Sequence, residues 1–110
     1  KINCIKMETT KFCNKWHPTH LIANGERQPL NNSSDGDYLW FRTDGTIEQL
    51  GDGFKQNGTW IYDTNTQNII VSVEDIITQY HIEHLSDTVL IIHSRNDVIG
   101  EFNFEMSRMD

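Results

Sequence analysis

The chain has 110 residues and a formal net charge of −7, with 36% hydrophobic and 10% aromatic residues. This length suits a single domain over residues 1–110, and the aromatic content argues against a disordered chain. The sequence has no cluster of Lys and Arg, which excludes a phosphate-neutralising surface for nucleic acid and disfavours adsorption to anionic membranes. It also has no apolar run near the roughly 20 residues that a transmembrane helix needs.

The N-terminal part predicts a short helix and then a first strand. Residues 8–15 contain neither Gly nor Pro and predict the helix. Residues 16–22 predict the strand, interrupted at Pro18, which suits an edge or a strand start. Cys4 and Cys13 are the only cysteines, and both a local disulfide and two free thiols fit their positions. We favour free thiols because Cys13 lies in the predicted helix.

The middle and C-terminal parts predict a long loop and an antiparallel meander. Residues 24–37 are rich in Asn, Ser, Gly, Pro and Asp, and predict the longest loop of the chain. Seven further strands are predicted at about 38–43, 46–50, 54–62, 68–74, 76–84, 88–94 and 98–107. Asp44-Gly45 and Asn57-Gly58 are turn signals. About eight strands with short connections predict an all-β, eight-stranded antiparallel up-and-down barrel with a short N-terminal helix.

Alternation along the strands predicts the side chains that face the barrel interior. In the last strand Phe102, Phe104 and Met106 share one face, and polar residues share the other. The aromatic residues predict either a cavity for a small apolar molecule or a filled core. The residues that we expect to bind a ligand are Phe41, Trp60, Tyr62, Tyr80, Ile82, Leu90, Phe102 and Phe104. The inward hydroxyls of Tyr62 and Tyr80 would need a partner, which a ligand or a trapped water provides.

A second candidate surface lies on the outside of the barrel. If Leu39 and Phe41 face inward, Trp40 and Arg42 face outward, and a Trp beside an Arg is a common interface pair. The alternative is a Trp that is covered by the loop 24–37. We expect a monomer or a weak dimer.

Motifs for catalysis and metal binding are missing from the sequence. It contains no Gly-x-Ser-x-Gly, phosphate-binding glycine loop, HExxH or Cys-x-x-Cys. His81 and His84 are three apart on a predicted strand, so they face opposite sides unless a bulge separates them. A metal site across strands from His17, His20 and His93 is a minor alternative. We expect no catalytic residue, no metal and no cofactor.

The order of the segments resembles a known family. The segments are the short helix, Asn14-Lys15-Trp16, 39–46, 58–60, 69–71, 80–86 and 89–92. Together they look like the small bacterial lipocalin-like domains, calycin-type β-barrels of secreted or envelope proteins of Bacteroidetes-type bacteria. Trp16 matches the Trp of the lipocalin Gly-x-Trp motif, with Asn14 in place of its glycine. The resemblance implies that Arg108 lies over Trp16.

The resemblance also implies a function and a location. It implies a non-enzymatic protein that binds a small apolar or amphipathic ligand inside the barrel. The alternative is a protein-interaction module, an inhibitor or accessory subunit, with a filled core and a binding surface at loop 24–37 and Trp40. We expect an exported protein, periplasmic, in the envelope or secreted, with a cytoplasmic location left open.

Overall fold

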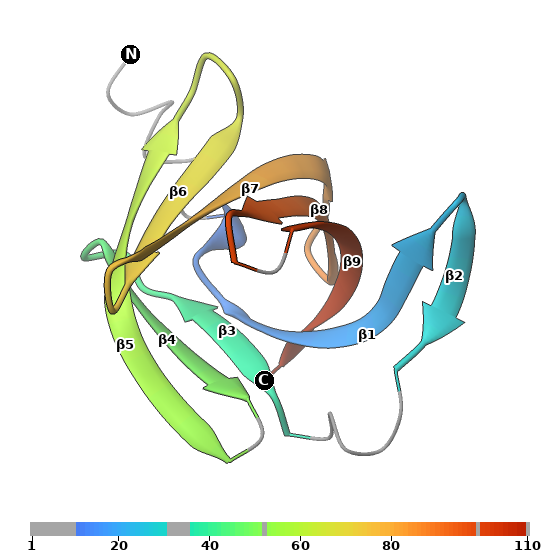
Figure 1. Ribbon diagram of the computed structural model, residues 1–110, viewed down its shortest axis with the longest axis horizontal. Coiled ribbons are helices and arrows are strands. Elements are labelled where there is room, and N and C mark those ends of the chain that lie inside the picture. Colours follow the sequence, from blue (N-terminus) through green and yellow to red (C-terminus); the bar gives the residue numbers. More distant parts are fainter. Residues whose placement is uncertain (1–10, 31–35, 52, 99, 110) are drawn as a thin grey trace.

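The computed structural model describes residues 11–30, 36–51, 53–98 and 100–109. Its strands are β1 (Lys15–Ala23), β2 (Glu26–Pro29), β3 (Tyr38–Phe41), β4 (Thr46–Gly51), β5 (Phe54–Asp63), β6 (Asn68–Val73), β7 (Ile76–Leu85), β8 (Val89–Asn96) and β9 (Gly100–Met109). From β3 to β9 each strand pairs antiparallel with the next, and β1 pairs with both β3 and β9 (Figure 1). The predicted all-β, up-and-down barrel of eight strands is therefore confirmed.

One additional strand, β2, lies inside the segment 24–37 for which the sequence predicts a loop. Asn24 and Gly25 have φ values of 54° and 78° and connect Ala23 directly to its partner Glu26. Two consecutive positive φ values define a type I′ hairpin turn, for which Asn-Gly is the favoured sequence. The polar composition of 24–37 therefore concealed a hairpin, which projects from the barrel in Figure 1. Residues 31–35 of the predicted loop lie outside the described residues.

One end of the barrel is closed by residues that precede β1. Residues 8–10 of the predicted helix lie outside the described residues, and the helix ends at Phe12 instead of continuing to Lys15. Phe12 and Trp16 are fully buried, and the Trp16 indole Nε1–H donates to the Phe12 carbonyl at 2.8 Å. The Phe12 ring centroid lies 5.4, 5.1 and 5.2 Å from those of Phe41, Trp60 and Tyr62. Phe12 therefore closes this end of the barrel by packing against three aromatic side chains.

Arg108 makes no cation–π contact with Trp16 among the described residues, in contrast to what the resemblance implied. The two residues are directly paired in the β1–β9 register. The Arg108 guanidinium instead donates to the Asp87 carbonyl at 3.5 Å. Across the described part of the chain, the cation–π contacts come from Lys15 and Arg42.

Gly58 lies in the middle of β5, which agrees with the predicted strand 54–62, so Asn57-Gly58 forms no turn. β5 pairs with β4 as far as Thr59 and with β6 from Thr59 onward. A Cβ at Gly58 would lie 2.1 Å from the carbonyl oxygen of Ser72. Glycine is therefore required where β5 changes partner, as is common at a barrel corner.

Candidate binding cavity

A cavity of about 360 Å³ occupies the end of the barrel away from Phe12. All eight strands of the barrel contribute to its wall. The lining residues are Pro18, Leu39, Gln49, Gln56, Val71, Val73, Ile76, Thr78, Tyr80, Ile92, Ser94, Asn96, Val98, Phe104 and Met106. Most of these described residues are apolar and none of them carries a charge. The volume is within the range of small-molecule sites.

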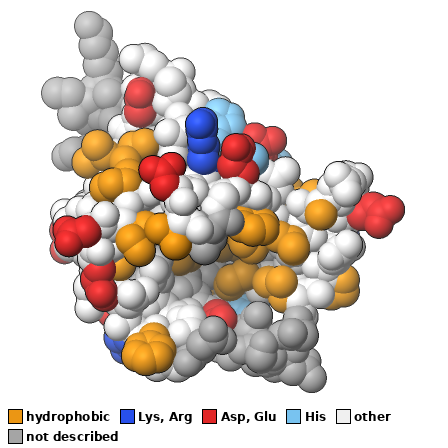
Figure 2. Space-filling view, in the orientation of Figure 1, with side chains coloured by type: hydrophobic (Ala, Val, Ile, Leu, Met, Phe, Trp, Pro, Cys, Tyr) orange, Lys and Arg blue, Asp and Glu red, His pale blue; other side chains and the backbone are white. Residues whose placement is uncertain are grey.

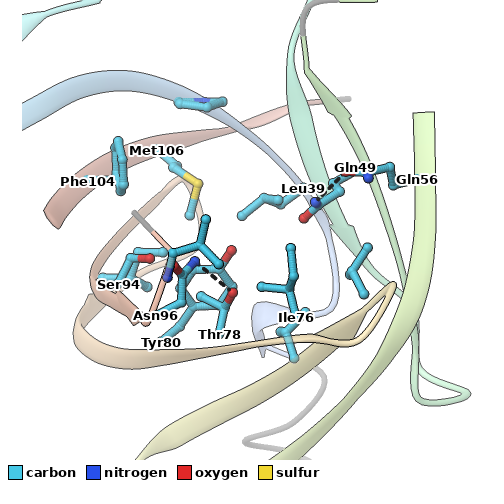
Figure 3. Close-up of a pocket in the computed structure, with 15 residues that line it drawn as sticks. Leu39, Gln49, Gln56, Ile76, Thr78, Tyr80, Ser94, Asn96, Phe104 and Met106 are labelled. Atoms are coloured by element: carbon cyan, nitrogen blue, oxygen red, sulfur yellow. Dashed lines mark hydrogen bonds between the residues drawn. The ribbon is translucent and has the colours of Figure 1, made fainter. Parts of the chain in front are cut away.

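Four of these residues form a polar patch on β7 and β8: Thr78, Tyr80, Ser94 and Asn96. Thr78 is paired with Asn96 and Tyr80 with Ser94, so the four side chains occupy adjacent inward positions. The Asn96 amide donates to the Thr78 hydroxyl at 3.2 Å. Figure 3 shows this polar patch on one side of the cavity.

The hydroxyls of Tyr80 and Ser94 have no hydrogen-bond partner among the described residues, although the side chains are only 9% and 3% exposed. Every fully inaccessible polar side-chain atom in the described part of the chain is hydrogen-bonded. The two oxygens therefore retain access to the cavity. Burial raises the pKa of Tyr80 to about 12, further above physiological pH than its ordinary value of 10.

The opposite wall carries a hydrogen-bonded chain that ends at the cavity mouth. The Gln49 amide donates to Gln56 at 3.2 Å (Figure 3). The Gln56 amide donates in turn to the Glu74 carboxylate at 3.1 Å. Glu74 and Asp75 form the two-residue turn between β6 and β7, with φ values of 48° and 69°. Since neither residue is glycine, this turn stores backbone strain beside the cavity.

The mouth of the cavity has an apolar rim with acidic residues beside it. Ile76 is 43% and Val98 69% exposed, although both line the cavity. Glu74, Asp75 and Asp97 are exposed at the turns next to these two residues. Figure 2 shows hydrophobic side chains gathered in the middle of one face of the molecule, with Asp and Glu side chains around them. An exposed apolar rim of this kind is typical of a binding site.

The structure does not bring the predicted ligand-binding residues together in one place. Tyr80 and Phe104 line the cavity. The others lie elsewhere. The packed core holds Phe41, Trp60 and Leu90. Tyr62 and Ile82 pack beside the core and line a second hollow at the closed end. Phe102 packs against Phe104 and is 38% exposed. Alternation identifies inward positions but not their depth along the barrel axis, which explains this division.

Sequence reasoning missed the polar members of the wall. Thr78 is two residues before Tyr80, and Ser94 and Asn96 continue the inward alternation of Leu90 and Ile92. The signal was therefore present as small polar residues at inward positions. A search for aromatic residues does not detect these small polar residues.

Trp40 and Arg42 lie on the outer face, away from the cavity. The Arg42 Cζ lies 4.2 Å and the Lys15 Nζ 4.8 Å from the centre of the half-buried Trp40 ring. Arg42 Nη2 also donates to Glu48 at 2.9 Å. Trp40 is therefore held between two cations on the barrel exterior, which leaves its role in an interface as a prediction.

The histidines also lie on the outer face of the barrel wall. A bulge between Ile82 and His84 puts His81 and His84 on the same side, each paired with a β8 residue, His93 and Ile91. In the ranges that the structure describes, no group of three or more His, Cys, Asp or Glu is placed to hold a metal. Burial raises the pKa of the Cys13 thiol to about 11, while Cys4 lies outside the described residues.

No helix within the described residues has the length and apolarity to span a bilayer.

A family model and a solved structure match this chain. A family model described as a lipocalin-like domain matches residues 14–92. The crystal structure of a DUF4847 family protein from Bacteroides vulgatus ATCC 8482 superposes with a TM-score of 0.61 and 14% sequence identity, covering 94% of this chain and 99% of that one. At this identity the likeness shows a shared fold alone. The search of curated proteins gave no match.

Proposed function

Because the chain belongs to the family of lipocalin-like domains, we propose that it is a non-enzymatic protein that holds a small apolar or amphipathic ligand inside its barrel. The cavity of about 360 Å³, walled by all eight barrel strands, is the observation that supports this proposal. Burial of an apolar ligand against this wall would contribute roughly 25 cal/mol of binding free energy for each Å² of apolar surface removed from water. The apolar rim at Ile76 and Val98 gives a ligand a path into the interior.

A neutral fluorescent dye tests the proposal directly. N-phenyl-1-naphthylamine is expected to brighten on binding to the protein, and native mass spectrometry of the purified protein would report any ligand retained from the host. Ile76→Trp narrows the mouth and is expected to weaken dye binding by about tenfold or more. Ile77→Trp is the matched control, because Ile77 is 56% exposed and the next residue in β7, so it points to the opposite face.

Two results would count against an internal ligand site. One is a dye that fails to bind the folded protein. The other is equal dye binding by the Ile76→Trp and Ile77→Trp proteins, because binding would then lie outside the cavity.

A second candidate function is a protein-interaction module, an inhibitor or accessory subunit. The exposed β2 strand and the outward Trp40 ring between Lys15 and Arg42 favour it. Trp40→Ala should then abolish a complex with the partner and leave dye binding unchanged. If Trp40→Ala leaves complex formation unchanged, this second function loses its support.

A further inference from the structure

Building on the proposed function, we infer that the cavity selects an uncharged ligand with a hydroxyl, carbonyl or amide oxygen and rejects the corresponding carboxylate. The polar patch on β7 and β8 would receive that oxygen. The apolar remainder of the ligand would contact the hydrophobic wall. Three features of the cavity support this selectivity.

The first feature is the absence of charge among the described residues of the wall. None of those that line the cavity is Lys, Arg, His, Asp or Glu. A carboxylate that enters would lose its water without meeting a cation. Burial of an unpaired charge is far costlier than burial of a neutral polar group that is hydrogen-bonded. A neutral head group avoids this cost.

The second feature is a pair of hydroxyls that the protein itself does not satisfy. The Tyr80 and Ser94 side chains are directly paired across β7 and β8 and are 9% and 3% exposed. Neither hydroxyl has a partner among the residues that the structure describes. Each donates one hydrogen bond and accepts others, so a ligand oxygen between them satisfies both. The Tyr80 hydroxyl is protonated across the physiological range, and burial raises its pKa further, to about 12.

The third feature is the charge at the entrance. Glu74 and Asp75 form one turn at the mouth and Asp97 lies in another, and all three are exposed. Acidic groups at an opening lower the local concentration of anions and leave neutral molecules unaffected. The entrance and the wall therefore disfavour the same class of ligand.

Matched alkyl probes test the inference. 1-Decanol and decanoate have the same chain length and differ in the head group, and each would compete with bound N-phenyl-1-naphthylamine at pH 8. We expect decanol to displace the dye at a concentration lower by at least about tenfold. Decanoate should bind more tightly as the pH falls toward the ordinary carboxyl pKa, because its protonated form is neutral.

A double variant tests the role of the polar patch. Tyr80→Phe with Ser94→Ala removes both hydroxyls and keeps the shape of the wall nearly unchanged. It should weaken decanol binding several-fold and keep dye binding. Ser72→Ala is the matched control, since Ser72 lies on β6 between two inward residues and therefore faces outward. Thermal unfolding checks that each variant is folded.

The outcomes separate this inference from the function on which it rests. If decanoate displaces the dye as well as decanol does, the selectivity is wrong while internal binding stands. If the double variant binds decanol as the parent does, the polar patch is not the head-group site. If dye, decanol and decanoate all fail to bind, the proposed function fails and the inference fails with it.

Discussion

Replacing Gly58 with alanine is expected to destabilise the barrel. The added Cβ would lie 2.1 Å from the Ser72 carbonyl oxygen and 2.7 Å from the Val73 Cγ2 atom. A backbone oxygen cannot rotate away as a side chain does, so β5 and β6 must separate at this point. Such overpacking costs about 1–3 kcal/mol, and the alanine offsets about 0.4–1 kcal/mol of this by restricting the unfolded chain. We expect a net loss of about 1 kcal/mol.

Thermal unfolding followed by circular dichroism measures this loss. For a domain of this size about 1 kcal/mol corresponds to a fall in Tm of about 4–8 °C. Gly51→Ala is the matched control, because a Cβ at Gly51 has no atom within 4 Å and the residue ends the neighbouring strand β4. The control should melt at the parent temperature or slightly above it. A Gly58→Ala protein that melts with the control would refute the idea that β5 needs glycine at its corner.

Three further substitutions test local features of the barrel. Asp75→Gly should raise stability by about 1 kcal/mol, because Asp75 has φ 69° in its turn, and a lower urea midpoint would contradict this. The His93 ring nitrogens lie 2.5 Å from Asn103 and 2.8 Å from Glu101, which raises its pKa above the usual 6.5. The stability from these contacts is complete below the pKa of His93 in the unfolded chain and is lost as pH rises through its pKa in the folded protein. Glu101→Gln removes the negative charge beside the ring, so NMR titration should give a lower pKa for His93 in this variant. Tyr80→Phe should remove a tyrosine that ionises at about pH 12 from an alkaline absorbance titration.

The strands could be predicted from the sequence because local signals agree with the fold. Along β6 the buried Ile69, Val71 and Val73 alternate with half-buried positions at a period of two, and turn residues bound the run on both sides. Long-range pairing then follows from short connections, since neighbouring strands have no room to do anything but pair antiparallel. The pairing of β1 with β3, which closes the barrel, was harder to predict from the sequence. It rests on only two paired positions, Lys15 with Trp40 and Trp16 with Leu39.

Two Asn-Gly dipeptides have different roles in the fold, which their sequence alone does not distinguish. Asn24-Gly25 and Asn57-Gly58 are identical dipeptides, yet the first is a hairpin turn and the second lies within a strand. Gly25 has φ 78°, whereas Gly58 is needed for the close approach of the Ser72 carbonyl. A dipeptide reports that a side chain is missing. It does not report whether the chain needs that freedom for its torsion angles or for its neighbours.

The barrel is filled at one end and hollow at the other, because large and small side chains are distributed unevenly along its axis. Large side chains gather at one end, where Phe12 enters from outside the strands and packs against Phe41 and Trp60. Inward positions at the other end carry small side chains such as Thr78 and Ser94, so the same wall cannot fill its interior there. The packed half therefore supplies most of the apolar burial that stabilises the fold. Substitutions that keep the volume of the cavity wall should then alter binding with little loss of stability, which is the condition that makes the polar patch testable.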